Sequence, residues 1–185
     1  FITAEDIPAE FRIDGGYGSG QFVADLPGVG AVVDAGKPTE RLCTDVHCGR
    51  DVWSNNISGH GGLTKQGIGT LVLTGSNTYS GPTLVNQGLL AVNGSLTSQV
   101  TVSNSGVLGG AGSIGALNAK SGGTVAPGNS IGTLNVAGDV NFDAGSTYAV
   151  ELSTTSSDRI VAGGKATLNG GTVTLALENS PTLLS

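Results

Sequence analysis

The sequence has no methionine, one tryptophan and two cysteines among its 185 residues, and only 4% of them are aromatic. Eight Lys and Arg against fourteen Asp and Glu give a net charge of −6. So few cations cannot form a basic stripe that neutralises phosphates, which argues against nucleic acid or an anionic membrane as a partner. A run of about 18 apolar residues is also lacking, so we expect no direct membrane insertion of this segment.

The sequence is rich in glycine and in residues that favour β-strands. Thirty-two glycines separate short runs such as "GTLVLTG", "QVTVSNSGVLGGAG" and "GGTVTLAL". Within the runs the apolar residues alternate or cluster as in strands, and helices are not expected. The chain opens at Phe1 without a charged-then-apolar leader, and we interpret it as a piece of a longer chain.

A glycine followed by a strand-like pair recurs along the chain. These glycines, Gly88, Gly106, Gly123, Gly145 and Gly171, lie 18, 17, 22 and 26 residues apart. One such unit cannot bury its apolar face alone, so neighbouring units stack as a solenoid. The pattern predicts an all-β parallel β-helix of about six coils and about 30 Å, with strands about 4.8 Å apart.

A β-sandwich is the alternative fold. Its hairpins would use turns of the Asn-Gly type, and the sequence contains Asn93-Gly94 and Asn169-Gly170. The scarcity of large rings favours the narrow interior of a β-helix, since its corners tolerate Gly and Asn.

Two regions differ in composition. Residues 1–55 hold most of the charged residues, both cysteines and Trp53, and we interpret them as a small N-terminal β cap or linker. Residues 56–185 form the repeat region, which we expect to be truncated at its C-terminal end. Trp53 would pack the cap onto the first coil.

Two stretches resemble a known family. "WSNNISGHGGLTKQGIGTLVLTGSNTYSGPTLVNQGLLAVNGSL", Trp53 to Leu96, is similar to the passenger-associated transport repeat of bacterial autotransporters. "GGTVAPGNSIGTLNVAGDVNFDAGSTYAVELS", Gly122 to Ser153, resembles the segment that commonly follows it. The resemblance implies a right-handed parallel β-helix between an N-terminal effector domain and a C-terminal outer-membrane barrel. The effector would be a subtilisin-like serine protease, and the passenger would cross the periplasm to the cell surface or the medium.

Ser130 stands in the G-x-S-x-G spacing of a hydrolase nucleophile, between Gly128 and Gly132. Such an elbow needs a helix after the serine and a later histidine. Here a strand-like run follows, and both histidines, His47 and His60, lie upstream. We therefore expect a coil corner and no catalytic residue.

The other chemical motifs are weak. Gly110, Gly112 and Gly115 match G-x-G-x-x-G without a following helix, and "GGYGSG", Gly15 to Gly20, lacks the aspartate of a calcium nonapeptide. Scattered carboxylates such as Asp139 and Asp143 leave calcium open as a minor alternative, but we expect neither metal nor cofactor.

"CTDVHC", Cys43 to Cys48, gathers the ligand-type residues Asp45 and His47 with the two cysteines. Alternate residues on a strand lie too far apart along the chain to converge on one ion, so we expect a Cys43–Cys48 disulfide in an exported protein.

Three function classes remain. The first is a noncatalytic stalk that assists secretion and folding and presents the effector. The second is an adhesin or self-association module that binds glycans or other copies of the rod, and the third is an enzyme such as an esterase or a polysaccharide lyase. For the stalk, Tyr79 and Tyr148 would pack in the core or at corners, His60 would lie in a surface turn, and Leu134, Val136, Val140 and Phe142 would face inward. The predicted repeat turns are Gly62, Gly88, Gly106, Gly123, Gly128, Gly132, Gly145 and Gly171.

Overall fold

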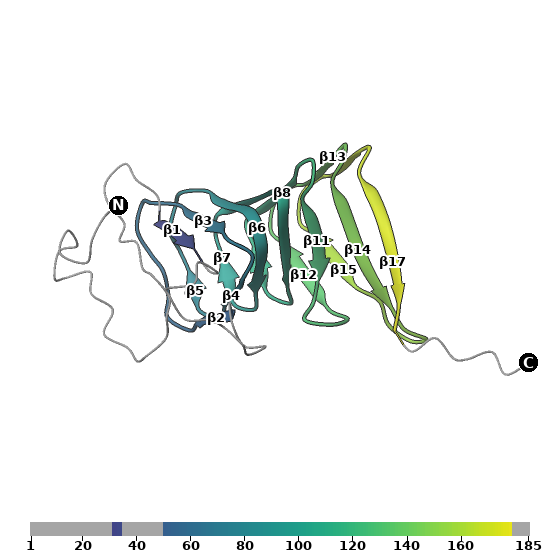
Figure 1. Ribbon diagram of the computed structural model, residues 1–185, viewed down its shortest axis with the longest axis horizontal. Coiled ribbons are helices and arrows are strands. Elements are labelled where there is room, and N and C mark those ends of the chain that lie inside the picture. The colour runs from purple at the N-terminus through teal and green to yellow at the C-terminus, as the bar shows by residue number, and fades with distance from the viewer. Residues whose placement is uncertain (1–30, 35–49, 179–185) are drawn as a thin grey trace, which may run out of the picture.

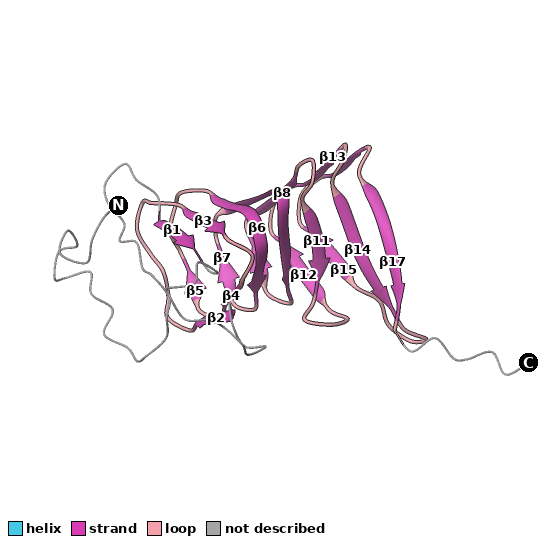
Figure 2. Cartoon of the chain, viewed as in Figure 1, coloured by secondary structure: helices cyan, strands magenta, loops and turns pink. Residues whose placement is uncertain are grey.

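Apolar side chains form one continuous buried cluster. The backbone winds around it in successive coils, as Figure 1 shows. The computed structural model describes residues 31–34 and 50–178, and in this part every regular element is a strand (Figure 2). About five coils stack along the long axis, each built from three strand segments. The predicted all-β parallel β-helix is confirmed, and no helix of the described residues could cross a membrane.

Each coil turns two corners and so contributes to three faces. The first and second faces belong to one 12-stranded sheet, because β6 (Thr83–Val92) and β8 (Gln99–Gly110) bend at a corner and continue from one face to the next. The third face is a separate 5-stranded sheet. Besides β6 and β8, the first face contains β1 (Ala31–Asp34), β3 (Leu63–Gln66), β10 (Ala116–Ala119), β13 (Val140–Asp143) and β16 (Ala166–Asn169).

The second and third faces repeat the same arrangement. On the second face, the later halves of β6 and β8 pair with the strands before and after them. This face also contains β2 (Arg50–Trp53), β4 (Thr70–Leu73), β11 (Thr124–Pro127), β14 (Thr147–Leu152) and β17 (Thr172–Leu177). The third face consists of β5 (Ser76–Asn77), β7 (Ser95–Leu96), β9 (Ser113–Ile114), β12 (Thr133–Val136) and β15 (Arg159–Ala162).

In-register pairing puts equivalent side chains above one another. On the second face Leu71, Leu90, Leu108 and Val125 are partners from coil to coil, and all four are 0% exposed. Burying each such side chain contributes about 1.5–3 kcal/mol. On the next coil the column continues with the half-buried Tyr148, whose ring lies 5.6 Å from that of Phe142.

The predicted alternation in "GTLNVAGDVNF" is confirmed. Leu134, Val136, Val140 and Phe142 are all buried, with at most 3% of each exposed. The sandwich alternative is wrong, because all pairs between the described strands are parallel. Asn93-Gly94 connects β6 to β7 and Asn169-Gly170 connects β16 to β17, so neither forms a hairpin.

From β3 onward, the corner between the first and second faces uses a left-handed residue in every described coil. Positive φ occurs there at a glycine or, once, at Asn104 (φ 59°), a residue type that tolerates this conformation. A side chain with a branched Cβ would be strained at these positions. The glycines of this corner column are Gly67, Gly88, Gly122, Gly145 and Gly170.

One coil departs from the predicted glycine alignment by one residue. The sequence pattern aligns Gly123 with Gly145, but Thr124 pairs with Thr147, which places Ser146 beside Gly123. Likewise, Thr147 pairs with Thr172, so Ser146 also aligns with Gly171. Gly145 instead takes the left-handed corner position, with a φ of 79°.

The N-terminal region is described only in part. β1 pairs with β3 and β2 pairs with β4, both in parallel, so these segments extend the first two faces. Trp53 packs, partly buried, against the core. The predicted cap otherwise falls outside the described residues, as does the predicted Cys43–Cys48 disulfide.

The inward column gives a direct stability test. Replacing Leu134 by Asp would bury a carboxylate without a partner, and we expect a loss of several kcal/mol in the free energy of unfolding. The neighbouring Asn135 is exposed and its Nδ2 donates only one long hydrogen bond, to the Gly112 carbonyl at 3.4 Å. Asn135→Asp is therefore the matched control and should cost no more than about 1 kcal/mol. Denaturant unfolding followed by circular dichroism measures both, and equal effects would contradict the alternation.

Candidate functional site

Lys65 on β3 is fully buried, with 0% of its surface exposed. Its ammonium donates to the carbonyl oxygens of Gln66 at 2.9 Å, Gly67 at 2.6 Å and Gln87 at 3.0 Å. The first two belong to the corner of its own coil and the third to the corner of the next coil. Since an ammonium has three donors, this side chain ties two consecutive corners together.

Gly88 makes room for this tie. It has a φ of 67°, and an added Cβ would lie 2.8 Å from the Lys65 Nζ. A side chain here would therefore meet both backbone strain and the ammonium. Lys65 and Gly88 form one structural unit although they lie on different coils.

Asn77 on β5 ties three coils on the third face. Its Oδ1 accepts from the Ile57 backbone N–H at 2.9 Å, and its Nδ2 donates to the carbonyls of Gly75 and Ser95, both at 3.1 Å. Only 1% of the residue is exposed. Its hydrogen bonds replace those that solvent would make, so burying the amide does not leave it unpaired.

Tyr79 takes part in a buried chain of hydrogen-bonded hydroxyl groups. Its phenol bonds to the Thr83 hydroxyl, which in turn bonds to the Ser98 hydroxyl at 2.7 Å. Burial raises the pKa of the Tyr79 phenol above its usual range. The predicted packing role of Tyr79 in the core is confirmed, since 3% of it is exposed.

Ser130 lies exposed in the loop between β11 and β12. Its hydroxyl donates to Oε1 of Glu178 at 2.6 Å. A strand follows it, as predicted, where a nucleophile elbow would have a helix. His60 lies exposed before β3, several coils away, and His47 falls outside the described residues.

Three carboxylates gather beside this loop, a cluster that the sequence pattern did not indicate. Asp158, 5% exposed, accepts from the backbone N–H groups of Gly132 and Glu151, each at 2.8 Å. Oε2 of Glu151 is enclosed and has no hydrogen-bond partner. Burial raises the pKa of Glu151, and the negative charges of Asp158 and Glu178 raise it further.

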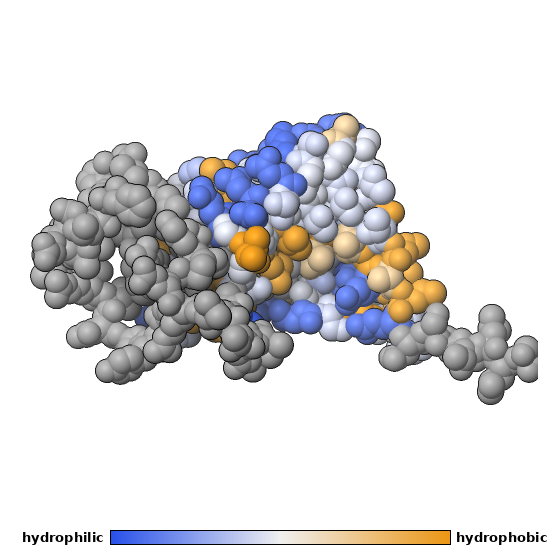
Figure 3. Space-filling model, in the orientation of Figure 1, coloured by the Kyte–Doolittle hydropathy of each residue, from blue (hydrophilic) through white to orange (hydrophobic). Residues whose placement is uncertain are grey.

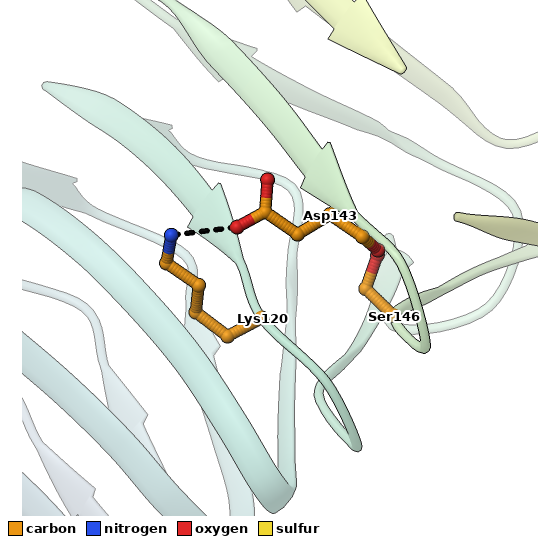
Figure 4. Close-up of polar contacts among 3 residues, drawn as sticks. All are labelled: Lys120, Asp143 and Ser146. Carbon is orange, nitrogen blue, oxygen red and sulfur yellow. Dashed lines mark hydrogen bonds and ion pairs between the residues drawn. The ribbon is translucent and has the colours of Figure 1, made fainter. Parts of the chain in front are cut away.

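Asp143 belongs to an ion pair between coils (Figure 4). Its Oδ2 lies 2.6 Å from the Lys120 Nζ, and this hydrogen bond lowers the pKa of Asp143. Asp139 accepts from the Lys165 backbone N–H at 2.8 Å. Within the described residues no group of three His, Cys, Asp or Glu side chains is placed to hold a metal ion.

The predicted turn glycines fall into two kinds. Gly88, Gly128 and Gly145 have positive φ, whereas at the others a backbone or side-chain atom of a nearby residue approaches closely. An added Cβ at each of this second kind would lie within 3.0 Å of an existing atom, at Gly62, Gly106, Gly123, Gly132 and Gly171. The G-x-G-x-x-G motif that begins at Gly110 and Gly112 is also followed by strands, β9 and β10, and not by a helix.

The residues that make these contacts coincide with a family pattern. The passenger-associated-transport-repeat family matches residues 63–92, from the start of β3 to the end of β6. The chain is 53% identical over 185 residues to an extracellular serine protease of Serratia marcescens. It is 35% identical over 129 residues to the autotransporter lipoprotein NalP of Neisseria meningitidis and 41% identical over 81 residues to the adhesin BmaC autotransporter of Brucella suis.

The chain belongs to the autotransporter passengers. The Serratia match covers 100% of this chain and 18% of that relative's length, so the chain spans less than a fifth of it. The NalP match covers 63% of this chain and 11% of NalP, and the BmaC match covers 42% and 2%. These relatives support an extracellular or cell-surface location for this passenger region.

Removing the Lys65 ammonium tests whether its hydrogen bonds to the corner carbonyls of two consecutive coils stabilise the fold. In Lys65→Met three carbonyl oxygens lose their donor, and we expect the free energy of unfolding to fall by about 1–3 kcal/mol. Lys165→Met is the matched control because Lys165 is exposed and its hydrogen bonds are made by its backbone N–H and carbonyl, which the substitution keeps. Equal stability of both variants in urea would contradict a structural role for Lys65.

Glu151 predicts a pH dependence of stability. A raised pKa means that the folded chain favours the protonated form, so this group's contribution falls as pH rises from about 4.3, the ordinary glutamate value, through the folded pKa. We expect Glu151→Gln to stabilise the fold at neutral pH but not at pH 4. Asp143→Asn is a control of opposite sign, because its lowered pKa gives a contribution that is lost on acidification. Melting temperatures across pH 2–8 measure both, because the contribution of Asp143 is lost only below the ordinary aspartate pKa of about 3.9. A Glu151→Gln difference that does not vary with pH would contradict the assignment.

Proposed function

We propose that this passenger region is a noncatalytic β-helical stalk that assists secretion and folding and presents an N-terminal effector outside the cell. The effector would be a serine protease of the subtilisin-like kind, and a C-terminal outer-membrane translocator would export the passenger. The observation that carries the proposal is the in-register stack of about five coils around one apolar column.

The stack suits folding during export. Each coil contacts mainly the coils before and after it, so structure can grow from one end as the chain emerges. The ties made by Lys65 and Asn77 also join only neighbouring coils. No contact that must wait for a distant part of the chain is needed to form a coil.

The relatives support a role that is separate from any one activity. The same region is similar to a relative named as a serine protease and to another named as an adhesin. A module found beside different named activities is better suited to presenting them than to performing one. The surroundings of Ser130 agree, because a strand follows it where a nucleophile elbow would have a helix.

Adhesion or self-association is the second candidate function. The relative named as an adhesin favours it, and so do the exposed apolar side chains on the last strands. Leu168, Val173, Leu175 and Leu177 are 53–69% exposed. Binding of cells, glycans or a second copy by the purified chain would favour this function over a stalk alone.

Secretion of the full-length parent tests the proposal. Leu134→Asp should reduce the amount of passenger at the cell surface or in the medium, because its coil cannot close around a carboxylate. Ser130→Ala should leave both the displayed amount and the protease activity per displayed molecule near the parent values.

Asn135→Asp is the control for Leu134→Asp, since it adds the same charge to an exposed neighbour. Loss of activity per displayed molecule in Ser130→Ala would make the serine a catalyst and overturn the proposal. Normal display of Leu134→Asp, with its instability shown separately, would remove the link between coil folding and secretion.

A further inference from the structure

An asparagine followed by a glycine occurs twice in the chain, at Asn93-Gly94 and at Asn169-Gly170. Both asparagines are exposed, Asn93 directly after β6 and Asn169 at the end of β16. In such a pair the glycine nitrogen can attack the asparagine side-chain amide, since glycine has no Cβ to hinder the approach. The attack requires the backbone to leave its folded conformation, so local opening decides which pair reacts.

The Asn93-Gly94 pair is held by coils on both sides. The Gly94 N–H donates to the Leu73 carbonyl at 3.0 Å, and the Gly94 carbonyl accepts from the Ser113 N–H at 3.0 Å. An added Cβ at Gly94 would overlap the carbonyl oxygen of Gly75. The Asn93 side chain makes three further hydrogen bonds. Opening this pair therefore breaks contacts with the coils before and after it.

The Asn169-Gly170 pair is held by a described coil on one side only. β16 pairs with β13, and no described strand pairs with its other edge. Gly170 forms an isolated bridge with Asp143 of β13, and an added Cβ would meet nothing nearer than the Ala144 Cβ at 3.5 Å. Figure 3 shows apolar residues at the end of the molecule that carries β17, where Leu175 is 66% exposed. This end opens more readily than the middle of the stack, because a strand with one neighbour has fewer hydrogen bonds to break.

The reaction of such a pair is a spontaneous deamidation. The Gly170 nitrogen gives up its proton and bonds to Cγ of Asn169, while the Cγ–Nδ2 bond breaks and the amide nitrogen takes up a proton and leaves as ammonia. Water then opens the succinimide ring at either carbonyl and yields aspartate or isoaspartate. Isoaspartate adds a methylene to the main chain, directly before the left-handed corner at Gly170. Water is the other reactant, and nothing is oxidised or reduced.

The product places a negative charge beside Asp143. Asp143 and Asn169 are register partners on adjacent strands, and the Lys120 Nζ lies 2.6 Å from Oδ2 of Asp143 (Figure 4). The hydrogen bond from Lys120 lowers the pKa of Asp143, and a hydrogen bond from the Asn169 side chain lowers it further. A carboxylate at position 169 removes this second hydrogen bond and puts like charges opposite each other, which destabilises the pairing of β13 with β16.

We propose that Asn169 is a site of spontaneous deamidation, that it reacts much faster than Asn93 in the folded protein, and that the product loosens the last described coil. The dipeptide is the same at both sites, so the difference comes from stacking on one side or on both. This inference goes beyond the stalk function and does not depend on it.

Peptide mapping by tandem mass spectrometry of the full 185-residue chain, incubated at neutral pH, tests the first part of the proposal. Each deamidation rate is divided by the rate of the same residue in urea, which removes the effect of the flanking sequence. We expect this ratio to be about tenfold or more higher for Asn169 than for Asn93. Equal ratios, a higher ratio for Asn93, or no reaction at Asn169 in the folded chain would overturn the proposal.

Melting temperatures of three variants test the effect of the product. Asn169→Asp reproduces the aspartate product, and we expect it to melt at a lower temperature than Asn169→Gln, which keeps an amide at this position. Asn135→Asp adds the same charge away from Asp143 and should lower the melting temperature less. If Asn169→Asp is as stable as Asn169→Gln, the product does not loosen the coil and this part of the proposal is wrong. Since secretion is not measured, failure here leaves the stalk function untouched.

Discussion

In-register pairing between coils is the constraint on which the rest of the structure depends. Because Leu71, Leu90, Leu108 and Val125 are stacked partners, every coil must return to the same place after a variable number of residues. The left-handed corner residues make this return possible, and the polar ties of Lys65 and Asn77 fix it. In a parallel stack, each inner strand also makes main-chain hydrogen bonds to the strands on both sides of it. A distortion of one coil therefore disturbs the coils before and after it.

The residues of the passenger-associated transport repeat, 63–92, stabilise the path by which one coil leads into the next. Its lysine supplies donors to corner carbonyls, its Gly88 provides space for the ammonium, and its Asn77 and Tyr79 satisfy polar groups within the stack. Burying a charge is costly unless its hydrogen bonds are made, and the three carbonyl oxygens around Lys65 meet that condition. These residues serve the fold, which is consistent with a region shared by relatives of different named activity.

The fold could be predicted because its signals are local and repeated. Alternation identified Leu134 and Phe142 as inward residues, and glycine spacing identified the coils. The register of the coil after Gly123 could not be predicted, since Gly145 and Ser146 compete for one corner position and only pairing decides between them. The cluster of Glu151, Asp158 and Glu178 was missed for a related reason. A loop folds Asp158 back onto Glu151, and only the stacking of β17 on β14 brings Glu178 beside them.

Hydrogen exchange in Leu108→Ala measures the dependence of one coil on its neighbours most directly. Leu108 is fully buried in β8, between β6 and β11. The account predicts that amides of β8 lose the most protection, that those of β6 and β11 lose part of theirs, and that the effect declines with each further coil. Loss confined to β8, with β6 and β11 exchanging as in the parent chain, would contradict the claim that stacking between coils holds the molecule together.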